Sequence, residues 1–187
     1  MKQVIHIFGA SGSGTSTLGR ELCRRCGFRF LDTDDFFWLP TDPPYTQSRP
    51  LEQRLALLER ELDKPGSVVL SGAMISWGNP LIPRLTLAVR LHTDTALRLE
   101  RLKRREREHF GSRLDPGGDM YQAHREFLAW AASYDTGDCS MRSKVQQDQW
   151  QETLPCPVLL LDGAAPPEEN AAAIQRELER HFHKGNL

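Results

Sequence analysis

The sequence contains no long apolar run, and no stretch approaches the roughly 20 consecutive apolar residues that a membrane-spanning helix needs. Its start also lacks the charged and apolar regions of a signal peptide, because an apolar strand pattern begins directly at Val4. These absences argue against a membrane protein, and we expect a cytoplasmic one.

Cysteine is scarce: four residues among 187 are too few for a disulfide framework. Cys23 and Cys26 have the spacing of a redox pair or of half a zinc site, but no second Cys or His pair follows at ligand spacing. Both share one helical face with Leu18 and Leu22. We therefore favour packing in the core, with a redox or zinc site as the alternative.

Net charge is nearly absent as well, since 24 Lys and Arg residues accompany 25 Asp and Glu residues, for a formal charge of −1. This balance gives no general attraction to nucleic acid or to anionic membranes, so we expect neither as a partner. A chain of 187 residues is long enough for one domain that buries roughly 70% of its unfolded surface. We expect a single domain over residues 1–187.

Glycines stand between the first predicted strand and the first predicted helix. The pattern G-x-x-x-x-G-K-[ST] of phosphate-binding loops matches Gly9, Gly14 and Ser16, but Thr15 stands where the pattern has lysine. Backbone N–H groups of such a loop converge on an anion. We predict that it binds nucleotide phosphate, with a flexible Gly/Ser loop as the alternative. The predicted binding residues are Gly9, Ser11, Gly12, Ser13, Gly14, Thr15, Ser16 and Thr17.

Acidic side chains follow the second predicted strand, at the edge where α/β sheets bind ligands. Phosphoryl transfer to a hydroxyl needs a carboxylate near Mg²⁺ or near the attacking oxygen. We predict that Ser16 and Asp32 hold Mg²⁺. Asp32 is also assigned a catalytic role. Asp34 is predicted to position the substrate or accept its proton, and Asp35 to cap the next turn. The alternative is a turn in which these side chains bond to the backbone.

Positive charge is concentrated between Arg98 and Arg113, where seven Lys and Arg residues accompany three Glu residues. The spacing i, i+3, i+7 places Arg98, Arg101 and Arg105 on one helical face, which suits a clamp on a transferring phosphoryl group. We predict that Arg101 and Arg105 are catalytic and that one of them replaces the charge of the missing lysine. A solvated helix with Glu–Arg pairs is the alternative, which we favour for Lys103, Arg104 and Arg107.

Strands and helices alternate along the chain, which predicts a parallel sheet between two helical layers. Strands are expected near residues 4–8, 28–31, 67–70, 85–91 and 157–161, and helices near 14–26, 51–62, 95–108, 120–134, 141–153 and 168–181. Residues 36–50 are rich in proline and aromatic residues and predict a surface excursion. Gly and Pro residues between 110 and 119 predict a mobile loop, which we interpret as a lid.

Three stretches together resemble the P-loop small-molecule kinases of the nucleoside-monophosphate-kinase superfamily, especially the adenylate-kinase-like and shikimate-kinase-like groups. They are Gly9–Thr17, the strand and DxD of Phe28–Asp35, and the strand and arginine-rich helix of Val89–Glu106. The resemblance implies an α/β three-layer P-loop NTPase fold with a five-stranded parallel sheet in the order 2-3-1-4-5. It also implies ATP, Mg²⁺, a lid near 108–119 and an acceptor-binding excursion near 36–62.

The chain departs from this family in three respects. Thr15 replaces the lysine, and Ser71-Gly72-Ala73 supplies no acidic residue after the third strand, so Asp32 would have to take the Mg²⁺ role. Residues 119–154 form a longer segment than the small kinases need. That segment contains further sources of positive charge: Arg125, Arg142 and Lys144.

The sequence therefore predicts ATP-dependent phosphoryl transfer to a small acceptor, such as a nucleotide, a nucleoside or a similar hydroxyl compound. Several aromatic residues suit the pocket of a ring-bearing acceptor, and equally suit packing of the excursion: Phe36, Phe37, Trp38, Tyr45 and Trp77. One alternative is a P-loop sensor or ATPase without kinase activity, which the missing lysine favours. The other is an RNA-related enzyme, which the lack of aromatic residues among the basic ones disfavours.

Overall fold

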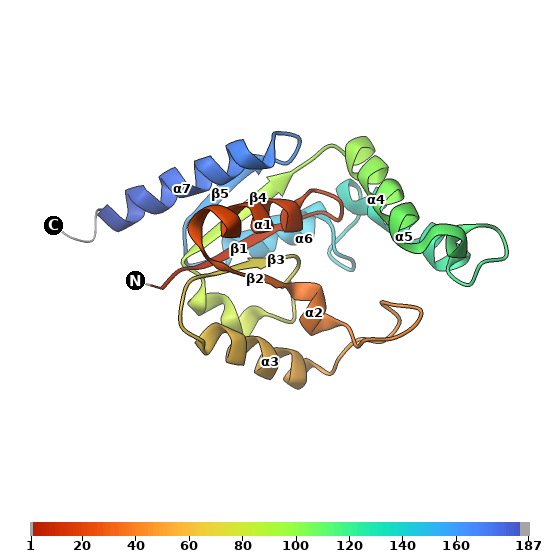
Figure 1. The fold of residues 1–187 in the computed structure, drawn as a ribbon, viewed down its shortest axis with the longest axis horizontal. Helices are drawn as coiled ribbons and strands as arrows, with labels where there is room; N and C mark the ends of the chain where they lie inside the picture. The colour runs from red at the N-terminus through yellow and green to blue at the C-terminus, as the bar shows by residue number, and fades with distance from the viewer. Residues whose placement is uncertain (1, 184–187) are drawn as a thin grey trace.

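Five parallel strands form one sheet in the order β2-β3-β1-β4-β5 in the computed structural model, which describes residues 2–183 (Figure 1). The strands are β1 (Val4–Gly9), β2 (Arg29–Asp32), β3 (Val68–Ser71), β4 (Leu87–His92) and β5 (Val158–Asp162). Each neighbouring pair runs parallel. The predicted α/β fold and strand order are therefore confirmed.

Helices connect these strands, and those expected near residues 120–134 and 141–153 are shorter than predicted. The helices are α1 (Thr15–Cys26), α2 (Thr33–Phe37), α3 (Leu51–Asp63), α4 (Thr95–Phe110), α5 (Tyr121–Ala132), α6 (Lys144–Glu152) and α7 (Pro167–His183), with the 3-10 turns η1 (Asn79–Arg84), η2 (Gly111–Leu114) and η3 (Ser133–Asp135). Gly27 ends α1 in a left-handed conformation with φ 67°. The side chain of Asp94 accepts a hydrogen bond from Ala96 N and caps α4.

Apolar layers pack on both faces of the sheet, which explains the continuous apolar runs of its central strands. On one face, Leu22 of α1 and Ile174 of α7 are fully buried against the sheet. On the other face, Leu58 of α3, Leu81 of η1 and Trp150 of α6 form the second layer. The sheet is thus enclosed by helices, and its carboxyl edge is left for the connecting loops.

The end of β2 differs from the sequence prediction. Phe36 and Phe37 belong to the short helix α2, whereas the pattern predicted that the excursion begins at Phe36. The cap of this helix is Asp32 and not Asp35, since Asp32 Oδ1 accepts a hydrogen bond from Asp34 N at 3.1 Å. A capping carboxylate precedes the first helical residue, and α2 begins directly after the strand.

Cys23 and Cys26 pack against the layer formed by α1 and α7. Burial raises the pKa of the Cys23 thiol to about 11, so the reactive thiolate is disfavoured. Within residues 2–183, no group of three or more His, Cys, Asp and Glu side chains could hold a metal ion. The two cysteines are partly buried and pack against the core, in agreement with the packing interpretation.

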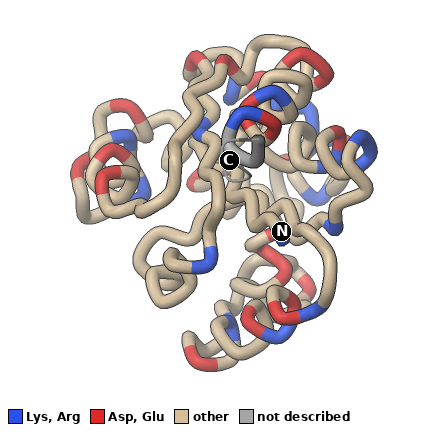
Figure 2. The backbone as a smooth tube through the Cα atoms, turned by 90° about the vertical axis from the view of Figure 1, so that its left-hand side faces the viewer, with Lys and Arg blue, Asp and Glu red and all other residues tan. Residues whose placement is uncertain are grey.

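Charges of both signs are distributed along the helices, and Figure 2 shows Lys and Arg segments interspersed with Asp and Glu segments. No helix in the described part of the chain combines the length and the apolar character that a membrane crossing requires.

A histidine lies in the middle of the sheet. His6 is fully buried, and its Nδ1 lies 3.1 Å from the carbonyl oxygen of Leu70. Its ring stacks on Phe8 and meets the edge of Trp150. Burial lowers the pKa of His6 from 6.5 to about 4, and the bond to Leu70 opposes this decrease. The imidazole is therefore neutral in the folded protein at pH 7.

His6→Phe should remove part of the pH dependence of stability. Between pH 6.5 and pH 4 the unfolded chain binds a proton at His6 that the folded chain excludes, so the folded state loses stability as the pH falls. From about pH 7.5 to about pH 5.5, urea unfolding should show that the wild type loses about 1 kcal/mol more than the variant. Equal losses in the two proteins would contradict this expectation.

Candidate functional site

The loop between β1 and α1 has the backbone conformation of an anion site. Gly14 is the N-cap of α1 with φ 99°, and Gly12 has φ 82°, so both are left-handed. A Cβ atom on Gly12 would lie 2.6 Å from the carbonyl oxygen of Arg98, so only glycine fits there. In the described structure no side chain caps α1, and its first turn has no acidic residue. Its first N–H groups are thus available to an anion.

The hydroxyl side chains of this loop differ in exposure. Ser13 is buried, and its Oγ has no hydrogen-bond partner among the described residues. Ser11, Thr15 and Ser16 are partly buried, and Thr17 is exposed. The predicted phosphate-binding residues thus form one continuous turn from the end of β1 into α1.

Three side-chain oxygens meet beside the loop. Ser16 Oγ donates a hydrogen bond to Asp32 Oδ2 at 2.9 Å and lies 3.2 Å from Ser71 Oγ. Mg²⁺ prefers oxygen ligands and usually combines one or two carboxylates with water and substrate phosphates. Ser16 and Asp32, the two predicted Mg²⁺ ligands, lie in contact and fit that ion. Sequence analysis did not assign Ser71, because a serine at a strand end carries no distinctive signal.

Asp34 follows in α2, with its side chain exposed to solvent on one side. The surrounding protein reduces its hydration and raises its pKa, and the negative charge of Asp32 adds to this increase. The positive charges of Arg142 and Arg105 oppose it. Asp34 therefore lies within electrostatic range of cations from two other segments. A carboxylate with a raised pKa is well suited to accept a proton.

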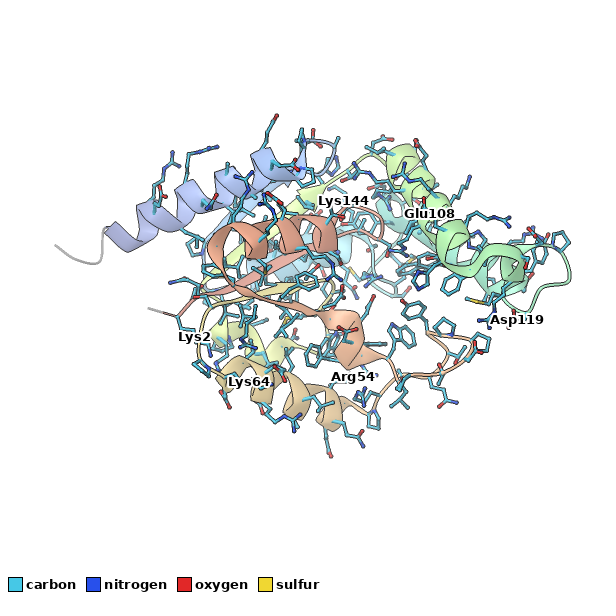
Figure 3. The ribbon with its side chains drawn as sticks, in the orientation of Figure 1. Lys2, Arg54, Lys64, Glu108, Asp119 and Lys144 are labelled. Carbon is cyan, nitrogen blue, oxygen red and sulfur yellow. The ribbon has the colours of Figure 1, made fainter. Side chains whose placement is uncertain are left out.

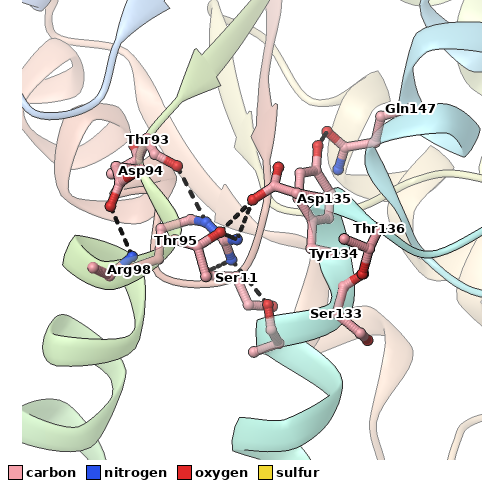
Figure 4. Close-up of polar contacts among 12 residues, drawn as sticks. Ser11, Thr93, Asp94, Thr95, Arg98, Ser133, Tyr134, Asp135, Thr136 and Gln147 are labelled. Carbon is pink, nitrogen blue, oxygen red and sulfur yellow. Dashed lines mark hydrogen bonds and ion pairs between the residues drawn. The ribbon is translucent and has the colours of Figure 1, made fainter.

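Arg98 of α4 is fully buried, and its guanidinium is surrounded by protein groups (Figure 4). Nε donates to the carbonyl oxygen of Thr93 at 3.2 Å, and Nη1 donates to those of Ser11 at 3.3 Å and Ala131 at 3.2 Å. Nη2 pairs with Asp135 at 3.3 Å. The predicted clamp on a phosphoryl group therefore does not include Arg98, because these contacts direct its side chain into the protein. They also connect the phosphate loop to α5.

The other two arginines of that face lie closer to solvent. Arg101 Nη1 donates to the carbonyl oxygen of Gly163 at 2.9 Å and lies 3.5 Å from that of Ser13. Arg105 Nη2 pairs with Glu106 Oε1 at 2.8 Å, as the alternative of Glu–Arg pairs expected, while its side chain is 61% exposed and its charge influences Asp34. The structure thus brings Arg101 to the phosphate loop and Arg105 into the electrostatic environment of Asp34.

The segment after α5 contacts the loop from another direction. Gln147 of α6 is buried, and its Nε2 donates to the carbonyl oxygen of Gly9 at 3.0 Å. Its Oε1 accepts a hydrogen bond from the Tyr134 hydroxyl at 2.8 Å. Arg142 Nη2 donates to Ser11 Oγ at 3.0 Å. Sequence analysis missed Gln147, because a glutamine in an amphipathic helix gives no sign of a contact so distant in the chain.

The segments predicted as lid and excursion are in contact. Arg113 Nη2 lies 2.7 Å from a carboxylate oxygen of Asp42 and 2.6 Å from one of Asp119. Figure 3 shows Glu108 and Asp119 on the region that projects away from the sheet, and the loop after α2 extends toward the same side in Figure 1. Part of the predicted irregular loop forms the 3-10 turn η2.

The aromatic residues divide between the core and the surface. Phe36 and Trp77 are buried in the layer that contains α3. Trp38 contacts Phe37 and Tyr45 through ring edges, with centroid distances of 4.8 Å and 6.0 Å. Tyr45 is 53% exposed. Packing therefore accounts for Phe36 and Trp77, while Tyr45 presents a ring to solvent.

Comparisons with known proteins agree with this geometry. A family model described as an AAA domain matches residues 5–113. An uncharacterized protein, YqaC, from Bacillus subtilis (strain 168) is 40% identical over 162 residues, which are 87% of this chain and 89% of that protein. Shikimate kinase 2 from Sodalis glossinidius (strain morsitans) is 27% identical over 187 residues, with 95% of this chain and 97% of that protein covered.

Solved structures resemble this fold over nearly its whole length. A gluconokinase from Sinorhizobium meliloti 1021 superimposes with a TM-score of 0.56 at 21% sequence identity. The match covers 99% of this chain and 98% of that chain. The two proteins are therefore similar in the arrangement of their sheet and helices.

Arg98→Met should destabilise the protein because it leaves buried carbonyl oxygens without donors. The free energy of unfolding should fall by at least about 2 kcal/mol, measured by urea denaturation. Arg104→Met on the exposed side of the same helix is the matched control and should change it by less than about 0.5 kcal/mol. Equal stability of the two variants would refute the structural role of Arg98.

Proposed function

Because this chain belongs to the AAA domain family, we propose that it transfers a phosphoryl group from ATP to a small acceptor. The observation that carries the proposal is the contact between Ser16 at the start of α1 and Asp32 at the end of β2. It places a phosphate loop and strand-end carboxylates at one edge of the sheet, where P-loop proteins assemble nucleotide and metal. The kinase names of two similar proteins support this reaction class.

In this proposal each residue has a separate task. Backbone N–H groups of residues 11–17 bind the donor phosphates, and Ser16 and Asp32 hold Mg²⁺, which neutralises phosphate charge when bound. Asp34 accepts the proton of the acceptor hydroxyl while the oxygen of that hydroxyl forms a bond to the γ-phosphorus. The bond from that phosphorus to the bridging oxygen breaks, and ADP leaves with the electron pair. Arg101 and Arg105 stabilise the transferring group.

The acceptor is proposed to be a nucleotide, a nucleoside or a similar hydroxyl compound, bound by residues 36–62. Tyr45 supports a ring-bearing acceptor, because it presents an aromatic surface within electrostatic range of Asp34 and Arg105. The segment 108–119 is the proposed lid, and its ion pair with Asp42 connects it to the acceptor side. Hydroxy acids join the test panel because the similar proteins are named for shikimate and gluconate.

A second candidate function is nucleotide binding without transfer, as in a sensor or an ATPase. The observation that favours it is Thr15, whose neutral hydroxyl stands where phosphate loops carry lysine. Detectable ATP binding without transfer to any acceptor is the result that this second function predicts.

Asp34→Asn should abolish phosphoryl transfer. With γ-labelled ATP and Mg²⁺, the wild type should label a member of a panel of nucleosides, nucleoside monophosphates, polyols and hydroxy acids. The amide cannot accept a proton, so we expect a rate decrease of at least about 100-fold. Asp35→Asn in the same helix is the matched control and should retain most of the rate.

The pH profile provides a second readout for Asp34. Wild-type kcat/KM should decline toward acid pH, because the protonated carboxyl group of Asp34 can no longer accept a proton. A profile without an acid limb, or full activity of the asparagine variant, would eliminate Asp34 as the proton acceptor.

Arg101→Ala and Arg105→Ala should each lower ATP turnover by at least about tenfold, the effect of losing one charged hydrogen bond to the transferring group. Lys103→Ala is the control, because Lys103 is exposed on another side of α4. Steady-state rates at saturating acceptor measure the effect. An unchanged rate rules out the arginine concerned.

A further inference from the structure

Arg142 contacts the phosphate loop from a segment far along the chain. Its Nη2 donates to Ser11 Oγ at 3.0 Å, and its guanidinium carbon lies 4.8 Å from the centroid of the Trp130 ring. Figure 4 shows that Ser11 also lies beside the buried Arg98. The loop is therefore held on one side by Arg98, and Arg142 contacts the hydroxyl of Ser11.

Among residues 2–183, no carboxylate forms an ion pair with Arg142, and its side chain donates a hydrogen bond to the neutral hydroxyl of Ser11. Partial burial lowers its pKa, and the negative charge of Asp34 opposes this decrease. A poorly hydrated cation without an ion pair gains more from a bound anion than a fully hydrated one does. The environment of Arg142 therefore favours anion binding.

Other basic side chains near the loop have different partners. Arg98 is fully buried, and Arg101 Nη1 donates to the carbonyl oxygen of Gly163. Lys144, two residues after Arg142, pairs with Asp148 at 3.1 Å. Arg101 and Arg142 both contact the loop, and neither forms an ion pair with a carboxylate of the described residues. Arg101 Nη1 is engaged by two backbone carbonyls, whereas Arg142 donates to one neutral hydroxyl.

We propose that Arg142 supplies the positive charge that lysine supplies in other phosphate loops, by binding the terminal phosphates of ATP. This inference rests on the proposed nucleotide-binding function. Its side chain contacts the loop at Ser11 and lies within electrostatic range of Asp34. A planar guanidinium can hold two phosphate oxygens at once, which a single ammonium does not do.

Calorimetry on the full chain tests this role with MgATP, inorganic pyrophosphate and adenosine as probes. Arg142→Gln should weaken ATP and pyrophosphate binding by at least about tenfold and leave adenosine binding unchanged, because the lost contact is to phosphate. Arg142→Lys, which keeps the charge, should bind ATP more tightly than the glutamine variant. Arg125→Gln is the matched control, since Arg125 is an exposed arginine that also lies over an aromatic ring, that of Tyr121.

A double-mutant cycle with Thr15→Lys tests whether Arg142 acts in place of the lysine. Thr15→Lys should improve ATP affinity more in the Arg142→Gln background than in the wild type, because the two cations serve the same phosphates. It should give no such rescue in Arg101→Ala. An equal improvement of ATP affinity in all three backgrounds would contradict the proposal that Arg142 acts in place of the lysine.

The remaining outcomes separate this inference from the proposed function. If the wild type transfers label and Arg142→Gln binds ATP within about twofold of it, Arg142 has no role in phosphate binding. If the wild type binds ATP but transfers nothing, the kinase function fails while the binding comparison still decides for or against Arg142. Absence of any ATP or pyrophosphate binding overturns both.

Discussion

The burial of the Arg98 guanidinium is the constraint on which the rest of the site depends. A cation removed from water must be surrounded by hydrogen-bond acceptors, and backbone carbonyls of Thr93, Ser11 and Ala131 provide them. These carbonyls belong to the end of β4, the phosphate loop and α5. The hydrogen bonds of this one guanidinium therefore determine the relative positions of three segments. The close approach of α4 to the loop also requires glycine at position 12.

The long segment 119–154 contacts the phosphate loop and the buried Arg98. It supplies the Ala131 carbonyl to Arg98, the Gln147 amide to the carbonyl of Gly9, and the Arg142 guanidinium to Ser11. A loop that has no cation of its own is thus contacted by cations from α4 and from the turn before α6. In the proposed role of Arg142, phosphate binding would depend on the packing of this segment, whereas the position of a lysine within the loop depends on the local turn.

Local chemistry made the fold and the loop predictable. The apolar run of β1, the glycines after it and the amphipathic α1 are consecutive in the chain, so their pattern can be read directly. The contact between Ser16 and Asp32 also followed from simple rules, because carboxyl ends of parallel strands meet at one edge. The cap of α2 was predicted wrongly, since adjacent aspartates offer the same side chain and only the start of the helix selects Asp32.

The sequence by itself determined the alternation of strands and helices, the phosphate loop with Thr15 in place of lysine, and the acidic end of β2. Only the tertiary structure decided which arginine of α4 is enclosed by protein groups and which lies at the phosphate loop. Helical spacing places Arg98 and Arg101 on one face, but packing against α5 buries Arg98 and leaves Arg101 at the loop. The physical reason is that spacing specifies direction around a helix axis, whereas burial depends on the neighbouring segment that covers that direction.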